Sequence, residues 1–274
     1  LADVAANFQQ SFPFDTSKAH SETEVRMLFD DKNLYVYVIC HDTLPGDYVI
    51  QTLRRDFSYP VTDAFTIILD PFNDQTNGFS FGVSPMGVQR EGLIARGGGQ
   101  GVSTDWDNRW FSAVQRSHDR WTAEMAIPFT TLRYKQGNTH WKINFTRNDL
   151  KRNESSSWAR VPRNFNIASL VFCGDLHWES PPPKPGLNMS FIPYLIGGYS
   201  EGFTPRKPAE FTKNAGLDAK ISITPGLNLD LTINPDFSQV EVDRQIINLT
   251  RFSLFFPERR NFFLENSDLF AQFG

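Results

Sequence analysis

The sequence predicts an all-β protein, an antiparallel β-sandwich followed by amphipathic β-hairpins of a partial barrel. Runs of alternating apolar and polar residues, bounded by Gly, Pro, Asn and Asp, recur along the 274 residues, whereas helical periodicity is scarce. No apolar run approaches the roughly 18 residues that a membrane-spanning helix needs. Apolar residues make up 40% of the chain, which is enough to build a core.

Eight segments have the strand pattern and are expected to form the sandwich. Turn-forming residues separate them, as in Asp-Asp-Lys-Asn at 30–33. A short helix is expected over residues 129–134, opened by Pro128. Trp121 and Trp141 share a strand face with apolar neighbours and are predicted core residues. The expected strands are 23–29, 34–41, 64–70, 78–83, 88–95, 110–116, 121–127 and 141–147.

A Pro-rich linker at residues 181–186 divides the chain into a sandwich at 1–180 and a C-terminal region at 187–274. In that region, 217–224 and 227–233 alternate strictly between apolar and polar residues, and 189–199 is a weaker third strand. This alternation is typical of outer-membrane barrel hairpins and equally of a half-exposed soluble sheet. About 90 residues are too few for a closed barrel of ~8 strands. We therefore expect either the front part of a longer protein or a small soluble appendage.

Charge and cysteine content limit the function classes. Lys+Arg 27 against Asp+Glu 31 gives a net charge of -4, so no broad positive surface exists and nucleic acid is excluded as the main partner.

Cys40 and Cys173 suit either a disulfide or two buried thiols, and we favour buried thiols. The histidines lack the spacing of a zinc site.

Motifs across the first 130 residues resemble those of the carbohydrate family 9 binding domain-like modules. They are TEVR at 23–26, DDKNLYV at 30–36, RRD at 54–56, LDPF at 69–72, NGF at 77–79, PMGVQ at 85–89, WTAE at 121–124 and IPF at 127–129. The resemblance implies a β-sandwich that binds a glycan without catalysis, in glycan capture or uptake. The family's usual opening motif has no counterpart before Phe8, which puts the first strand of the sandwich in doubt.

Two later motifs resemble the start of an outer-membrane β-barrel domain of the DUF5916 type, which follows such modules in many Bacteroidetes-type bacteria. They are NPDFSQVE at 234–241 and FPERRNFFLEN at 256–266. This resemblance implies a protein of the bacterial outer membrane whose sandwich lies in the periplasm or at the cell surface.

The segment Asp-Trp-Asp-Asn-Arg-Trp at 105–110 is the predicted centre of the ligand site. It follows a Gly-rich run at 97–101 and combines aromatic faces with the carboxylate, amide and guanidinium groups that bind sugar hydroxyls. We expect Trp106 to lie in a loop with its indole exposed at one rim, whereas Trp110 begins a strand and suits the core equally. The predicted ligand-binding residues are Trp106, Asp107, Arg109, Trp110, Trp158, Arg55 and Asp56. For Arg55 and Asp56, an ion pair that fixes a loop is the simpler explanation.

One turn gathers four oxygen-bearing side chains, from Asp70, Asn73, Asp74 and Asn77. Such a group suits Ca²⁺, which prefers oxygen ligands, and the related modules hold structural calcium. The spacing is not that of an EF-hand, and a hydrogen-bonded Asx turn explains the pattern equally well.

Catalysis has weak support in the sequence. Glycoside hydrolysis needs two opposed carboxylates, and Glu124 with Asp107 is the pair to consider. Glu124 lies mid-strand, where a structural role is simpler, so no catalytic residue is predicted. One alternative is an interaction or plug-like domain that binds an envelope protein partner beside a membrane barrel. A second is a glycoside hydrolase or its accessory module.

Overall fold

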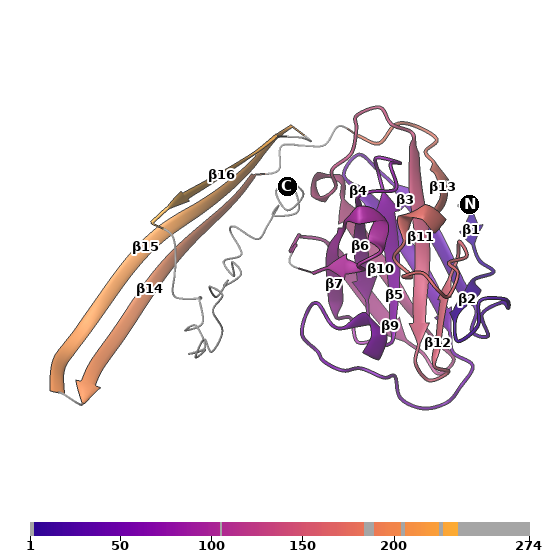
Figure 1. Ribbon diagram of the computed structural model, residues 1–274, viewed down its shortest axis with the longest axis horizontal. Coiled ribbons are helices and arrows are strands. Elements are labelled where there is room, and N and C mark those ends of the chain that lie inside the picture. The colour runs from indigo at the N-terminus through magenta and orange to yellow at the C-terminus, as the bar shows by residue number, and fades with distance from the viewer. Residues whose placement is uncertain (1–2, 105, 184–188, 204–205, 225–226, 235–274) are drawn as a thin grey trace, which may run out of the picture. The chain divides into compact units, whose positions relative to one another are not determined.

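The computed structural model describes residues 3–183 except 105, and residues 189–234 except 204–205 and 225–226. The chain divides into two compact units, residues 1–186 and 187–274. Every strand pairing between described residues is antiparallel (Figure 1). Within these residues, no helix is long and apolar enough to cross a membrane.

Five strands of the first unit form one layer of the sandwich. β4 and β10 pair along their whole length, from Arg120 opposite His41 to Pro128 opposite Asn33. Alternation turns Val36 and Val38 inward, so that this sheet covers the core with one face. The strand order is β1 (Val4–Ala5), β3 (Thr23–Phe29), β4 (Asn33–His41), β10 (Arg120–Pro128) and β9 (Phe111–Arg116).

A larger sheet forms the second layer, and it is buried on both faces at its centre. Every residue of β5 and β6 is buried, which explains why Ala64–Asp70 is almost continuously apolar. The strand order is β2 (Gln9–Phe12), β12 (Glu154–Ser157), β11 (His140–Asp149), β5 (Ala64–Asp70), β6 (Gly78–Val83), β7 (Gln89–Ile94) and β8 (Val102–Ser103), with β13 (Gly174–His177) on the free part of β11.

The main core lies between the two layers. Trp121 and Trp141 are fully buried there, as predicted, and Trp141 contacts Trp178 at a ring-centroid distance of 4.9 Å. Cys40 and Cys173 are free, buried thiols, which confirms the favoured interpretation, and burial raises the pKa of each to about 12.

Two local predictions differ from the structure. The helix expected at 129–134 is wrong: only a 3₁₀ turn forms over Phe129–Thr131, and Leu132 is already extended. The segment is too short for a stable helix, and its apolar side chains all enter the core. A first strand is also present, because β1 pairs with β3.

The described residues of the second unit form a three-stranded sheet, in the order β14 (Met189–Phe203), β15 (Arg206–Thr224) and β16 (Leu227–Ile233). The predicted hairpins are therefore formed, with Leu217 opposite Ile233 and Ala219 opposite Leu231. Phe191 and Leu195 lie on the same face as these residues, by their register with β15. Leu195 is 87% exposed, so this apolar face is largely uncovered within the described residues.

Candidate functional site

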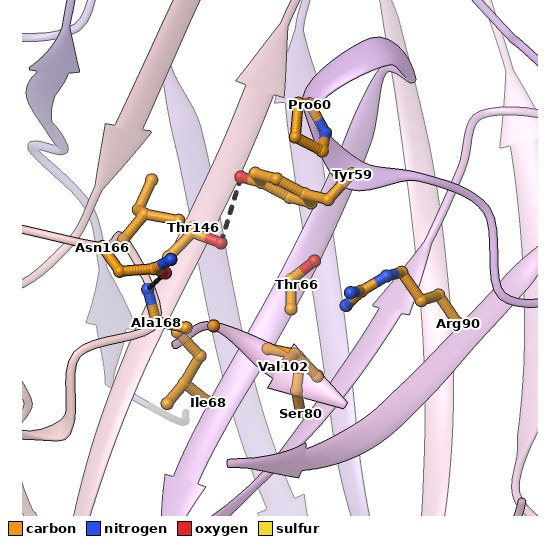
Figure 2. A pocket seen from close by; sticks show the side chains of 12 residues that line it. Tyr59, Pro60, Thr66, Ile68, Ser80, Arg90, Val102, Thr146, Asn166 and Ala168 are labelled. Atoms are coloured by element: carbon orange, nitrogen blue, oxygen red, sulfur yellow. Dashed lines mark hydrogen bonds between the residues drawn. The ribbon is translucent and has the colours of Figure 1, made fainter. Parts of the chain in front are cut away.

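A pocket of about 250 Å³ opens on the outer face of the larger sheet, away from the main core (Figure 2). Its floor comes from strands β5, β6, β7 and β11. One wall is the 59–60 turn, and the other comes from residues 101–102 and 166–168. The polar side chains that line it are Tyr59, Thr66, Ser80, Arg90, Thr146 and Asn166.

Strand alternation places these side chains in the pocket. Phe65 and Ile67 of β5 enter the main core, so Thr66 between them faces the opposite side of the sheet. Gly82 lies directly across from Thr66 on β6. A Cβ at Gly82 would approach Thr66 Oγ1 to 2.8 Å, so the glycine leaves the space above the threonine open.

Hydroxyl and amide groups of the pocket have unused hydrogen-bonding capacity. Thr66 Oγ1 and Ser80 Oγ are buried and have no partner among the described residues. The Tyr59 hydroxyl donates to Thr146 Oγ1 at 3.3 Å, and Asn166 Oδ1 accepts from the Ala168 N–H at 2.9 Å. The Asn166 amide nitrogen is thus left to donate. Buried polar groups normally find partners, so the Thr66 and Ser80 hydroxyls point to a polar ligand.

Arg90 brings a guanidinium group to the same pocket. The residue is 9% exposed, and its Nε donates to the Phe57 carbonyl oxygen at 3.1 Å. Burial lowers its pKa, but an arginine keeps its proton in proteins, so the pocket carries a positive charge. In Figure 2 the guanidinium points toward Thr66 and the interior of the pocket.

The expected position of Trp106 is wrong, because its indole is buried rather than exposed. Trp106 is 6% exposed and packs against Phe79 and Phe81 at ring-centroid distances of 5.3 and 6.0 Å. Trp110 is 3% exposed and meets Phe81 edge-on. Burying an indole contributes about 2–3 kcal/mol, so the chain folds both rings into the core. Neither ring offers a face to a sugar.

Several predicted site residues instead meet at Glu91, a buried carboxylate that the sequence analysis missed. Glu91 Oε1 accepts from Arg55 Nε at 2.9 Å and from the Asn108 N–H at 3.2 Å, and it also bonds to Arg55 Nη2. Its Oε2 accepts from Trp110 Nε1 at 3.1 Å. Asp107 Oδ1 lies 4.0 Å from Arg55 Nε. The geometry therefore supports the ion-pair interpretation of Arg55.

The segment 55–57 is held against β7 at each of its residues. Arg55 bonds to Glu91, the Asp56 N–H donates to the Gln89 carbonyl at 3.0 Å, and the Phe57 carbonyl accepts from Arg90. Burial, reinforced by the charges of Glu91 and Asp107, raises the pKa of Asp56 to about 6. Because Tyr59 follows two residues later, this attachment fixes one wall of the pocket.

The remaining predicted ligand-binding residues lie outside the residues that line the pocket. The guanidinium of Arg109 lies 5.4 Å from the ring centroid of Phe111. Trp158 is half-buried, and its ring packs on Phe145 at 5.8 Å. A Cβ at Gly174 would come within 2.7 Å of the Trp158 ring, so this tryptophan also has a packing role.

The predicted calcium turn is stabilised by its own hydrogen bonds. Asp70 Oδ2 accepts from the Gln75 N–H at 2.8 Å, and Asp74 Oδ1 accepts from the N–H groups of Thr76 at 2.8 Å and Asn77 at 3.2 Å. Asn73, with φ 56°, takes the left-handed conformation that such turns need. No group of three or more His, Cys, Asp or Glu among the described residues is placed to hold a metal ion. The arrangement supports the Asx-turn interpretation.

Two family models match the chain. The Carbohydrate family 9 binding domain-like model matches residues 5–164, and the Domain of unknown function DUF5916 matches residues 185–274. No curated protein matches the sequence.

A solved structure with a TM-score of 0.50 shares the sandwich fold. A protein from Bacteroides uniformis ATCC 8492, described as a proposed carbohydrate-binding protein, is 11% identical with a TM-score of 0.50, over 65% of this chain and 87% of its own. A family 9 module from Caldicellulosiruptor kristjanssonii has a TM-score of 0.43 in two structures. With cellotriose bound it is 14% identical over 64% of this chain and 82% of its own. With glucose bound it is 15% identical over 64% of this chain and 85% of its own.

Proposed function

The chain belongs to the carbohydrate family 9 binding domain-like family, and from this premise we propose that its pocket captures a sugar unit of a glycan without chemical conversion. The observation that carries the proposal is the set of unpartnered, buried hydroxyls at the floor of an open pocket. At about 250 Å³ the pocket lies just below the roughly 300–1,000 Å³ typical of drug-sized ligands, which suits one sugar ring.

The chemistry of the lining matches a polyol. Thr66, Ser80 and Asn166 supply hydroxyl and amide groups that donate to or accept from sugar hydroxyls. None of the described residues that line the pocket is Asp, Glu or His. A pair of opposed carboxylates is what glycoside hydrolysis requires, so this lining favours binding over hydrolysis.

Tyr59 supplies the aromatic surface of the pocket. Figure 2 shows its ring lying across one side of the pocket, on the same side as Pro60. A ring in this position covers the apolar face of a pyranose, which is the usual way that proteins desolvate a sugar. Burial raises the pKa of Tyr59 to about 12, so its hydroxyl stays neutral across the physiological pH range.

Replacing Tyr59 with alanine is expected to weaken sugar binding about 10-fold, because the stacking surface is lost. Isothermal titration of the full chain with a panel of mono- and oligosaccharides measures the effect. Tyr37→Ala is the matched control, since Tyr37 is an exposed tyrosine of β4 in the other sheet, and it is expected to bind as the unmodified protein does. If no saccharide of the panel binds to the unmodified chain, the proposal fails.

We further propose that the second unit places the module at the bacterial outer membrane through strands whose apolar face contacts lipid. The uncovered apolar side chains of β14–β16 favour this, as does the alternation along these strands. Phe191, Leu195 and Leu231 share that face. The sandwich would then capture glycan in the periplasm or at the cell surface.

A lysine at Leu195 is expected to reduce the amount of protein in the outer membrane several-fold, because it puts a charge on the lipid-facing side. Ile192→Lys is the control, since Ile192 is also exposed and apolar but lies on the opposite face of β14. Fractionation of cells that make the native protein, followed by a carbonate wash, measures the effect. Release of the native protein by the wash, or equal losses in both variants, would contradict the membrane assignment.

A further inference from the structure

Among the residues that the structure describes, Arg90 is the one cationic side chain that lines the pocket, and no acidic residue lines it. A guanidinium group has five N–H donors in a fixed fork. The described part of the chain gives Arg90 one hydrogen bond, from Nε to the Phe57 carbonyl. Its two Nη groups have neither a hydrogen-bond acceptor nor a carboxylate within ion-pair distance among those residues.

A buried charge without a partner is costly, so its retention needs an explanation. Burial lowers the pKa of the Arg90 guanidinium group, and the negative charge of Asp56 acts in the opposite direction. The two side chains nevertheless form no ion pair among the described residues. The Asp56 carboxylate accepts a hydrogen bond from the Glu91 N–H instead. The positive charge of Arg90 therefore faces the pocket rather than a fixed partner within the sandwich.

From this arrangement we infer that the pocket selects an acidic sugar, a uronic acid whose carboxylate pairs with the guanidinium of Arg90. The inference rests on the proposed sugar binding and names the class of sugar. A carboxylate accepts two parallel N–H bonds from a guanidinium, which adds both strength and orientation. Thr66 and Ser80, beside Arg90 on the floor, then meet the ring hydroxyls.

The single cation argues for a carboxylate rather than a phosphate ester. A phosphate monoester carries close to two negative charges near neutral pH and is normally bound by several cationic groups or by backbone N–H groups. The lining offers one cationic side chain. One carboxylate balances that charge, whereas a phosphate would leave negative charge uncompensated in a partly buried site.

Paired sugars that differ only at C6 test the inference. Glucuronate is compared with glucose, and galacturonate with galactose, by isothermal titration of the full chain at low and high salt. At least one uronate is expected to bind about 10-fold more tightly than its neutral partner, since a hydrogen bond to a charged group stabilises more than a neutral one. The preference is expected to shrink at high salt. Glucose 6-phosphate is included as the phosphate probe.

Variants then test whether Arg90 causes the preference for the uronate over the neutral sugar. Arg90→Gln is expected to bring uronate and neutral sugar to equal affinity, while Arg90→Lys keeps part of the difference. Arg54→Gln, which removes an exposed arginine outside the pocket lining, is expected to keep all of it. The comparison in the unmodified protein does not depend on whether the Arg90 variants fold, and thermal melts report on their folding.

Each outcome decides between the two proposals. Equal affinity for both members of every pair would overturn the acidic-sugar inference and leave sugar binding intact. Tighter binding of glucose 6-phosphate than of either uronate would also overturn the inference. Absence of binding by every saccharide would remove the proposed function and the inference together.

Discussion

Replacing Trp106 with alanine is expected to lower the free energy of unfolding by about 3–5 kcal/mol, as large core truncations do. The indole is buried against Phe79 and Phe81, so its removal leaves a cavity beside β6. The sugar affinity of the folded fraction is expected to stay unchanged, because Trp106 does not line the pocket. Urea unfolding measures the first quantity, and titration in the absence of urea measures the second.

Phe111→Ala is the matched control for this loss of an aromatic ring. Phe111 follows the same segment but is 52% exposed, so its removal is expected to change the stability by about 0.5 kcal/mol or less. Unchanged stability of Trp106→Ala together with lost sugar binding would show that the indole contacts the ligand after all.

Periodicity predicted the sandwich well wherever a strand was long enough to show it. The bounds of β3, β5 and β6 match the predicted segments, β3 because its two faces differ in burial, and β5 and β6 because each is a short run of buried residues between turns. The two-residue strands β1 and β8 have no period to detect, and they form because neighbouring strands offer free hydrogen-bonding edges.

The pocket was not predictable from the sequence in the same way. Its polar residues come from stretches as far apart as Tyr59 and Asn166, and only the pairing of β5, β6, β7 and β11 brings them together. A partial signal did exist, because Thr66 and Ser80 are polar residues within buried segments that are mainly apolar. In a strand covered on both faces, a polar side chain either meets a partner or lines a polar space.

The prediction that Trp106 of the 105–110 segment is exposed failed for a related reason. A stretch that combines Trp, Asp, Asn and Arg has the same composition whether its rings contact a sugar or pack in the core. The deciding residue is Glu91, which lies on a different strand and accepts the hydrogen bond of the Trp110 indole. Arg55 and Asp56 were predicted either to bind the ligand or to form an ion pair that fixes a loop. Arg55 pairs with Glu91, and both residues attach the 55–57 segment to β7 rather than line the pocket.

The second large effect is expected at Glu91, where alanine should cost about 3–5 kcal/mol of stability, since a buried donor left without its acceptor costs about 1–3 kcal/mol. The substitution leaves the Trp110 indole N–H and the Asn108 N–H without their acceptor and releases Arg55. Glu91→Gln should cost less, because one amide oxygen still accepts a hydrogen bond. Chemical unfolding at pH 7 measures both variants.

Glu24→Ala is the control for loss of an ion-paired glutamate. Glu24 pairs with Arg26 at 3.1 Å on the partly exposed side of β3, where such pairs contribute about 1 kcal/mol or less. Equal losses in Glu91→Ala and Glu24→Ala would show that the Glu91 contacts do not stabilise the fold as argued.

The same variant tests whether the contacts of Glu91 also position the pocket wall. Glu91 and Arg90 are neighbours on β7, one facing the core side and the other the pocket, and both hold the segment that leads to Tyr59. Glu91→Ala is therefore expected to weaken sugar binding several-fold in the protein that remains folded, although Glu91 lies outside the pocket lining. Trp106→Ala, with a comparable loss of stability, should leave that affinity unchanged. A difference between two equally destabilised variants would identify the attachment of residues 55–57 to β7 as the element that positions Tyr59.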